Sequence, residues 1–224
     1  MKRKIITTND GSKTIHIEEW NEQYHSIHGA IQEAQHVFIK NGLDHFLSKT
    51  KNKAISILEI GFGTGLNAFL TYLQSEKIAT QFNYVGVEAY PILSDELDQL
   101  NYAELISKNQ KHLFLKLHTI PWGEETIISS NFSLLKRKQH FQDISDMAAF
   151  DLIYFDAFGA RVQPDLWTES IFNIMSKALR KDGVLVTYSA KGSARRAMES
   201  VGLTTEILAG PPGKRHMLRA TKKS

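Results

Sequence analysis

Segments with strand character alternate with segments of helical spacing along most of this sequence, and this alternation limits the folds that the chain can adopt. Residues 55–60 form an apolar run interrupted only by Ser56 and Glu59, and an amphipathic helix follows from Leu66. Further strand and helix pairs continue to about residue 203, and two strand-like segments close the chain. Such alternation predicts an α/β fold, with a mainly parallel sheet covered by helices on both faces.

The first 50 residues depart from this alternation. Two β-prone runs flank Asn-Asp-Gly at residues 9–11, which is a strong hairpin signal. Apolar residues then recur at helical spacing over residues 31–47, with a break expected near Gly42. We therefore expect an N-terminal hairpin and helical extension over residues 1–50, and the main domain over residues 51–224.

Two segments of the main domain are assigned from local patterns alone. Residues 112–120 read HLFLKLHTI and, together with residues 125–130, are expected to form a strand region. The segment from Pro164 is expected to form a capped helix that is stopped by Gly183.

A glycine-rich turn, GFGTG at residues 61–65, joins the first strand of the main domain to its helix. Glycine lets the backbone turn with positive φ and approach a ligand closely. The third glycine comes one residue earlier than in the dinucleotide fingerprint G-x-G-x-x-G. Glu88 ends the next strand, where a carboxylate can accept both ribose hydroxyls of an adenosine and would repel a 2′-phosphate. The pattern predicts an adenosine-containing cofactor at the carboxyl ends of the strands.

Asp156 ends another buried strand, residues 152–155. A carboxylate in such a place is costly unless something binds it. If this strand lies beside residues 55–60, Asp156 faces the glycine turn across the crevice. The sequence therefore predicts that Asp156 points at the reactive end of the cofactor; a cap on the loop that follows is the alternative.

Composition excludes several classes of protein. The chain of 224 residues has no cysteine, hence no disulfide and no thiolate chemistry. No window is apolar enough to cross a membrane and the N-terminus lacks a signal peptide, so we expect a cytoplasmic protein. His25, His28 and His36 lack carboxylates at metal-ligating spacing, and no metal is expected. The net charge is only +3, but bases outnumber acids from Arg180 onward, which favours a polyanionic partner such as RNA.

Four stretches resemble a known family. They are YHSIHGAIQEAQHVFI at residues 24–39, LEIGFGTGLNAFL at 58–70, FDAFGARVQPDLWTESIF at 155–172 and GPPGKRHMLRATK at 210–222. Together they look like the MnmC-type tRNA methyltransferases, in particular the stand-alone form often called MnmD. The resemblance spans residues 5–221 and implies a Rossmann-like class I fold, which has an antiparallel C-terminal strand.

The resemblance implies methyl transfer from S-adenosyl-L-methionine to the amine of 5-aminomethyl-(2-thio)uridine at the tRNA wobble position. Some relatives carry a fused flavin-dependent oxidase that makes this amine. The sequence ends near residue 224, so we expect no oxidase activity from it and a separate oxidase as an upstream partner. The predicted RNA contact is the anticodon loop of tRNA.

Three groups of residues are predicted to form the site. Asp156 is the catalytic candidate. The cofactor group is Glu59, Gly61, Phe62, Gly63, Thr64, Gly65, Asn67, Glu88 and Asp156. The substrate group is Tyr24, His28, Gln32, Glu33, Phe158, Trp167, Tyr188, Lys214 and Arg215. Phe158 and Trp167 are the candidates for stacking on a splayed-out base, although Trp167 fits a core position better, and Lys214 and Arg215 are the candidates for phosphate contacts.

Asp156 is expected to orient the amine rather than to deprotonate it. An alkylammonium titrates near 10 and a carboxylate near 4, so the carboxylate is a weak base for that proton. We expect it to bind the amine and stabilise the positive charge that grows on nitrogen. Water or Tyr188 would then take the proton.

Two other functions stay open from the sequence. One is an amine transferase of the same fold acting on a small molecule, against which the basic C-terminal region argues. The other is a catalytically silent RNA-binding homologue, against which the intact glycine turn, Glu88 and Asp156 argue. A comparison of binding to aminomethylated and to unmodified tRNA distinguishes the small-molecule transferase from the tRNA methyltransferase. Failure to bind S-adenosyl-L-methionine would support the silent RNA-binding homologue.

Overall fold

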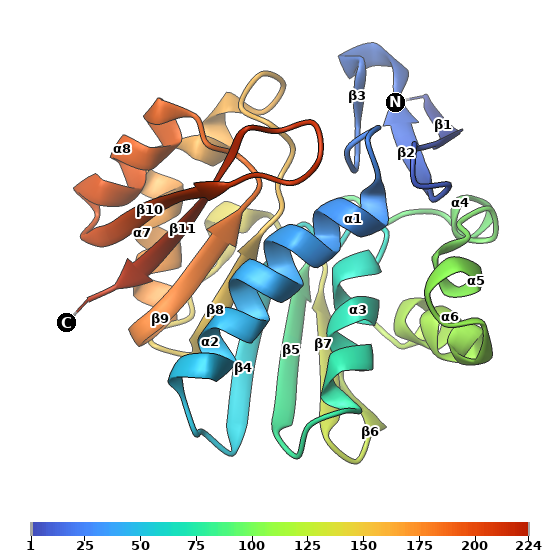
Figure 1. Cartoon of the computed structure of the whole chain (residues 1–224), viewed down its shortest axis with the longest axis horizontal. Helices are drawn as coiled ribbons and strands as arrows, with labels where there is room; N and C mark the ends of the chain where they lie inside the picture. The colour runs from blue at the N-terminus through green and yellow to red at the C-terminus, as the bar shows by residue number, and fades with distance from the viewer. Residues whose placement is uncertain (1, 224) are drawn as a thin grey trace.

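The computed structural model describes residues 2–223 and is built around one eight-stranded sheet (Figure 1). The strands in chain order are β1 (Arg3–Thr7), β2 (Lys13–Ile17), β3 (Glu22–Gln23), β4 (Ala54–Ile60), β5 (Gln81–Val87), β6 (Glu125–Ser129), β7 (Phe132–Arg137), β8 (Phe150–Phe155), β9 (Leu179–Thr187), β10 (Leu203–Ala209) and β11 (His216–Lys222).

The helices are mostly short. The α-helices are α1 (Ala30–Ala34), α2 (His45–Lys49), α3 (Leu66–Ser75), α4 (Ser94–Leu97), α5 (Tyr102–Ile106), α6 (Lys111–Thr119), α7 (Glu169–Ala178) and α8 (Gly192–Ser200). The 3-10 helices are η1 (Glu18–Trp20), η3 (Lys108–Gln110), η4 (Phe141–Asp143) and η5 (Pro164–Trp167), and η2 (Gln35–Asp44) is a π-helix.

The order of the main sheet is β10-β11-β9-β8-β4-β5-β7-β6. The strands β9, β8, β4, β5 and β7 run parallel to their neighbours in this series. β11 lies between β9 and β10 and is antiparallel to both, which confirms the predicted antiparallel C-terminal strand. β6 adds an antiparallel edge strand beside β7.

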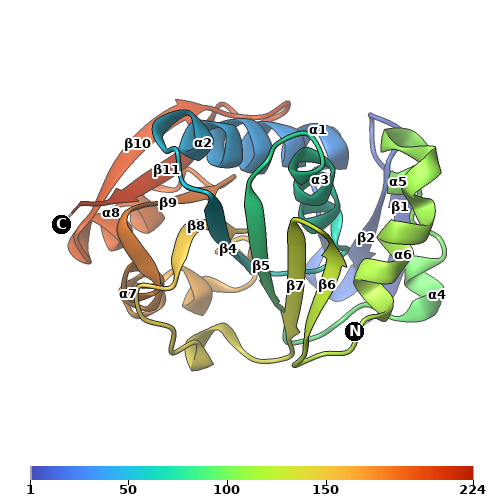
Figure 2. The same cartoon turned by 90° about the horizontal axis from the view of Figure 1, so that it is seen from below.

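Alternate residues of the central strands face two separate apolar cores. Ile57 of β4 points into the core shared with α1, η2, α3 and α6, whereas Leu58 points into the core shared with α7 and α8. Helices therefore cover both faces of the sheet (Figure 2). Because successive strand residues face opposite sides, the continuous apolar runs of β4 and β8 are what a doubly covered sheet requires.

The helix after the N-terminal hairpin does not break at Gly42, so that prediction was wrong. α1, η2 and α2 follow one another without interruption over residues 30–49 and pack on the sheet. A Cβ built on Gly42 would lie 2.9 Å from Cγ2 of Val186 and 3.3 Å from the ring of Tyr154. Glycine thus lets the helix approach the sheet closely, rather than ending it.

Two segments of the main domain also differ from expectation. Residues 112–120, predicted as strand, lie almost wholly in α6, whose buried residues Leu113, Phe114 and Leu117 recur at helical spacing. The helix expected to run from Pro164 to Gly183 is a 3-10 turn, η5, followed by α7, and α7 ends at Ala178 because β9 starts at the next residue.

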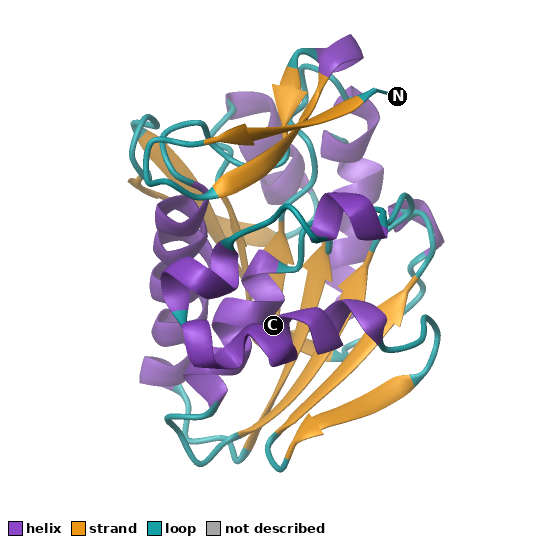
Figure 3. Ribbon diagram, turned by 90° about the vertical axis from the view of Figure 1, so that its right-hand side faces the viewer, coloured by secondary structure: helices purple, strands orange, loops and turns teal. Residues whose placement is uncertain are grey.

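The predicted N-terminal hairpin is confirmed as β1 and β2, paired in register Ile5↔Ile15. With β3 they form a small three-stranded sheet. This sheet lies beyond the carboxyl ends of the central parallel strands (Figure 3). It thereby covers the edge at which open α/β sheets bind their ligands.

Candidate active site

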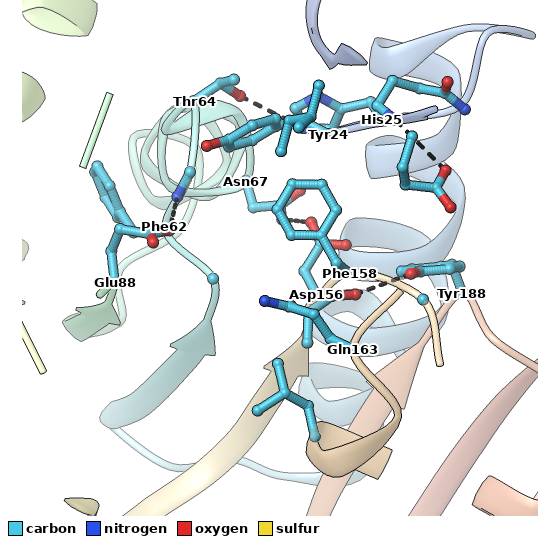
Figure 4. A pocket seen from close by; sticks show the side chains of 18 of the residues that line it. Tyr24, His25, Phe62, Thr64, Asn67, Glu88, Asp156, Phe158, Gln163 and Tyr188 are labelled. Carbon is cyan, nitrogen blue, oxygen red and sulfur yellow. Dashed lines mark hydrogen bonds between the residues drawn. The ribbon is translucent and has the colours of Figure 1, made fainter. Parts of the chain in front are cut away.

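A cavity of about 490 Å³ lies between the carboxyl ends of the central strands and the N-terminal sheet. Its wall combines segments that are far apart in the sequence (Figure 4). The predicted site residues that line it are Tyr24, His28, Glu33, Glu59, Gly61, Phe62, Gly63, Thr64, Asn67, Glu88, Asp156, Phe158, Tyr188 and Lys214.

The glycine turn forms one wall of this cavity. Gly61, Gly63 and Gly65 all have positive φ, at 88°, 49° and 70°. A Cβ on Gly61 would lie 2.7 Å from the carbonyl oxygen of Asp156, so the turn touches the chain that leaves β8. The backbone N–H of Asp156 also donates to the carbonyl of Ile60 at 2.9 Å. Asp156 and the glycine turn therefore share one crevice.

Glu88 stands beside this turn. One of its carboxylate oxygens accepts the N–H of Gly63 at 3.0 Å and the other accepts the N–H of Tyr90 at 2.9 Å. Each oxygen keeps a further lone pair for a ligand. A turn without side chains at its glycines, followed by a fixed carboxylate, fits the adenosyl part of S-adenosyl-L-methionine.

Asp156 lies on the other side of the glycine turn from Glu88. Its Oδ2 accepts a hydrogen bond from the Asn67 amide at 2.9 Å. Burial, and next the negative charge of Glu33, raise the pKa of Asp156 to about 7, although the Asn67 hydrogen bond and Lys214 act in the opposite direction. Asp156 is therefore a stronger proton acceptor than the ordinary carboxylate that was expected from the sequence.

Glu59 is more deeply buried, with 1% of its surface exposed. Within residues 2–223 neither of its carboxyl oxygens has a partner in good hydrogen-bond geometry. Burial raises its pKa well above the usual value, although the nearby polar groups of Tyr84 and Asn67 act in the opposite direction. Burial therefore favours the neutral, protonated form of the Glu59 carboxyl group. It lies under the cavity beside Asn67 and Tyr84, both of which also hold a buried polar atom without a partner in this part of the chain.

A second carboxylate, Glu33 of α1, faces the cavity from the opposite side. One oxygen accepts the N–H of Ser26 at 3.0 Å, and the other pairs with the ammonium of Lys214. The same ammonium lies 3.8 Å from the ring centroid of Tyr188. The Tyr188 hydroxyl donates to the carbonyl of Ala157 at 2.8 Å, and burial raises its pKa. Tyr188 is consequently a poor proton acceptor, contrary to the suggestion from sequence.

Aromatic side chains close the cavity from above. The ring of Phe158 meets Trp20 at 5.4 Å and Tyr24 at 4.9 Å, both edge-to-face. The loop that carries Phe158 is tied to the N-terminal extension by Arg161, whose guanidinium donates to Trp20 O, Asn21 O and Glu22 Oε2 at 2.9–3.1 Å. The roof over the site therefore depends on segments about 140 residues apart.

Four predicted site residues do not line the cavity. Gly65, the last residue of the glycine turn, precedes α3 and does not line the cavity, and Gln32 and Arg215 are exposed outside the cavity. Trp167 is 5% exposed, packs on Phe155 and donates its indole N–H to Phe158 O at 2.7 Å. It is a core residue that supports Phe158, so its stacking role was wrong.

Sequence reasoning missed several lining residues. His25, considered only as a metal ligand, is buried between Thr14 and Thr64, with ring nitrogens 3.1 and 3.4 Å from their hydroxyls. Burial lowers its pKa to about 4, so its ring is neutral. The loop after β7 contributes His140, Phe141 and Gln142. The carboxyl end of a parallel strand beside β5 was a usable signal for that loop.

Residues 2–223 hold neither a metal-binding cluster nor a membrane-spanning helix. Among these residues no group of three or more His, Cys, Asp or Glu side chains is placed to hold a metal ion. None of the helices described has the length and apolar character needed to cross a membrane.

Comparison with protein families places the cavity in context. A family described as S-adenosyl-L-methionine-dependent methyltransferase matches residues 124–223. The "tRNA 5-methylaminomethyl-2-thiouridine biosynthesis bifunctional protein MnmC" of Idiomarina loihiensis is 27% identical over 215 residues, covering 89% of this chain and 35% of the relative. The protein of the same name from Nitrosospira multiformis is 27% identical over 209 residues, covering 89% and 34%. The chain thus spans about a third of the length of these relatives.

Solved structures of other proteins share the fold of this chain. MNMC2 from Aquifex aeolicus superposes with a TM-score of 0.79 at 25% identity, covering all of this chain and 71% of that one. Spermidine synthase from Thermotoga maritima, at a TM-score of 0.57 and 12% identity over 98% of this chain and 68% of its own, shares the fold alone. The fold, the cofactor and the family resemblance expected from the sequence are confirmed: the chain has the class I methyltransferase fold and is similar to the MnmC-type proteins, and residues 124–223 match a family of S-adenosyl-L-methionine-dependent methyltransferases.

Proposed function

We propose that this chain methylates the amine of 5-aminomethyl-(2-thio)uridine at the wobble position of tRNA, giving the methylaminomethyl form. The observation that carries the proposal is the position of Asp156. It stands between the glycine turn and Glu88 on one side and Glu33, Tyr188 and Phe158 on the other, all lining one cavity. A cation-accepting pocket beside the methyl donor suits an amine acceptor.

The residues of the chain have separable roles in this reaction. Bound S-adenosyl-L-methionine would supply an electrophilic methyl group on its sulfonium. Asp156 would hold the amine, orient its lone pair and stabilise the charge that develops on nitrogen. With a pKa of about 7, it would also be able to take the proton that the methylated amine releases, either directly or through water.

The acceptor base must leave the anticodon loop to reach Asp156, because the cavity is roofed by the N-terminal sheet. Phe158, half-buried between Trp20 and Tyr24, is our candidate for stacking on that base. Arg215 on the β10–β11 turn is exposed and is kept as a candidate for phosphate contact. We also propose a cytoplasmic location, because tRNA is the proposed substrate. Because the relatives are named as bifunctional, we also propose a separate flavin-dependent oxidase upstream.

The test is an assay with anticodon stem-loop RNA that carries either 5-aminomethyluridine or plain uridine. We expect methylation of the first RNA only. Asp156→Asn is expected to lower kcat by about 10²-fold or more, the usual cost of losing one charge-stabilising group, and to change S-adenosyl-L-methionine affinity by no more than a few-fold in calorimetry. Asp165→Asn, an exposed carboxylate on the same loop, is the matched control and should keep activity. Equal methylation of both RNAs would reject the proposal.

A further inference from the structure

The turn between β10 and β11, residues 210–215, brings a lysine into the active site. Gly213, at φ +82°, seats this turn directly on His28: a Cβ there would lie 2.0 Å from Cδ2 of the imidazole ring. Pro212, Gly213 and Arg215 stay exposed, whereas the side chain of Lys214 between them is 32% exposed and lines the cavity. The turn thus covers the acceptor side of the site and directs one ammonium group inward.

The ammonium of Lys214 meets an environment built for an alkylammonium ion. It pairs with Glu33, whose side chain is only 6% exposed, and lies 3.8 Å from the ring centroid of Tyr188. A carboxylate combined with an aromatic face is a recurrent way to bind such a cation. Asp156 lies within electrostatic reach of both Glu33 and Lys214.

Lys214 is chemically similar to the acceptor that we propose. Both present a primary amine on an sp³ carbon, and both are cations in water. On the acceptor side of the cavity, the carboxyl groups of Glu33 and Asp156 and the ring of Tyr188 are the groups that Lys214 meets. A second ammonium that entered beside Lys214 would be repelled by it and would find Glu33 already paired.

Building on the proposed function, we infer that Glu33, Asp156 and Tyr188 form the subsite for the acceptor amine and that Lys214 occupies it in the free protein. The acceptor displaces Lys214, whose four-carbon side chain turns outward to a phosphate of the incoming RNA. A free small amine brings no phosphate and therefore leaves the displaced lysine without a partner. Lys214 in this way selects amines that are carried on a polyanion.

The experiment compares two acceptors, 5-aminomethyluridine as the free nucleoside and the anticodon stem-loop that carries it. Lys214→Met keeps the size of the side chain and removes the charge. We expect kcat/KM for the nucleoside to rise about fivefold or more, because the internal competitor is gone, and kcat/KM for the stem-loop to fall by a similar factor, because a phosphate partner is lost. The ratio of kcat/KM for the stem-loop to kcat/KM for the nucleoside therefore falls, because the first value decreases and the second increases.

Lys181→Met is the matched control, because Lys181 is exposed at the amino end of β9, away from the cavity, and should leave both values unchanged. Lys214→Gln is a second neutral variant in case Lys214→Met folds poorly, and thermal unfolding together with binding of S-adenosylhomocysteine checks that each variant is folded. Equal loss with both acceptors would show an ordinary substrate contact, and no change with either would show a surface charge; both overturn the inference. A wild-type protein inactive on both acceptors would instead reject the proposed function.

Discussion

At the scale of single residues, Asp156 shows how burial changes the chemistry of an ordinary side chain. An exposed aspartate is a weak base that stays ionised at neutral pH. Enclosure in the cavity, with Glu33 nearby, raises the pKa of Asp156 to about 7. Near neutral pH such a carboxyl is about half ionised, so it can accept a proton and still bind a cation. Sequence alone placed Asp156 in the crevice but could not reveal this shift, because it depends on neighbours distant in the chain.

The raised pKa has a consequence for stability that can be measured. The folded pKa lies above the unfolded value of 3.8, so the stabilising contribution is full below about pH 4 and is lost as the pH rises through 7. Asp156→Asn removes the ionising group. We expect the free energy of unfolding of the variant, relative to that of the wild type, to increase by about 3 kcal/mol between pH 4.5 and pH 8.

Urea unfolding of both proteins at the two pH values measures this difference. Taking mutant minus wild type cancels the other titrating groups. A variant that is less stable than the wild type by the same amount at both pH values would contradict the raised pKa of Asp156.

At the scale of elements, the sequence predicted the central strands and misplaced what surrounds them. β4, β5 and β8 were predicted correctly, because a short apolar run that ends in a glycine or an acidic residue is typical of a buried strand. α6 was missed because Leu113, Leu115 and Leu117 alternate as in a strand, while the buried set of Leu113, Phe114 and Leu117 is evident only in three dimensions. Local pattern could not show which of these leucines meets the core.

A substitution of Gly42 tests whether the helix over residues 30–49 packs closely on the sheet. Helix propensity alone predicts that Gly42→Ala stabilises the protein by about 1 kcal/mol. Here the added methyl would press against Val186 and Tyr154, which are fully buried in the sheet. We therefore expect a net loss of about 1–3 kcal/mol in the free energy of unfolding. Lys40→Ala, at an exposed position of the same helix, is the control and should be neutral or slightly stabilising. A more stable Gly42→Ala protein would show that the helix does not pack as described.

At the scale of the whole molecule, the site is assembled from segments that are distant in the sequence and meet at one edge of the sheet. The glycine turn and Asp156 come from the parallel sheet, Glu33 from the helix before it, Lys214 from the last hairpin, and Phe158 with Tyr24 from the roof. Periodicity and spacing predicted the first two, since adjacent parallel strands end at one edge. No local pattern encodes the ion pair between Glu33 and Lys214 or the hydrogen bonds of Arg161 to the N-terminal extension. Both sets of contacts join residues more than 130 positions apart.

The most direct test is a crystal structure of the protein with S-adenosylhomocysteine. We predict that the ribose hydroxyls bind Glu88, that the homocysteine part crosses the glycine turn, and that the sulfur faces the Asp156 carboxylate across a gap that one amine nitrogen fills. A ligand bound elsewhere, or one whose sulfur points away from Asp156, would contradict the account.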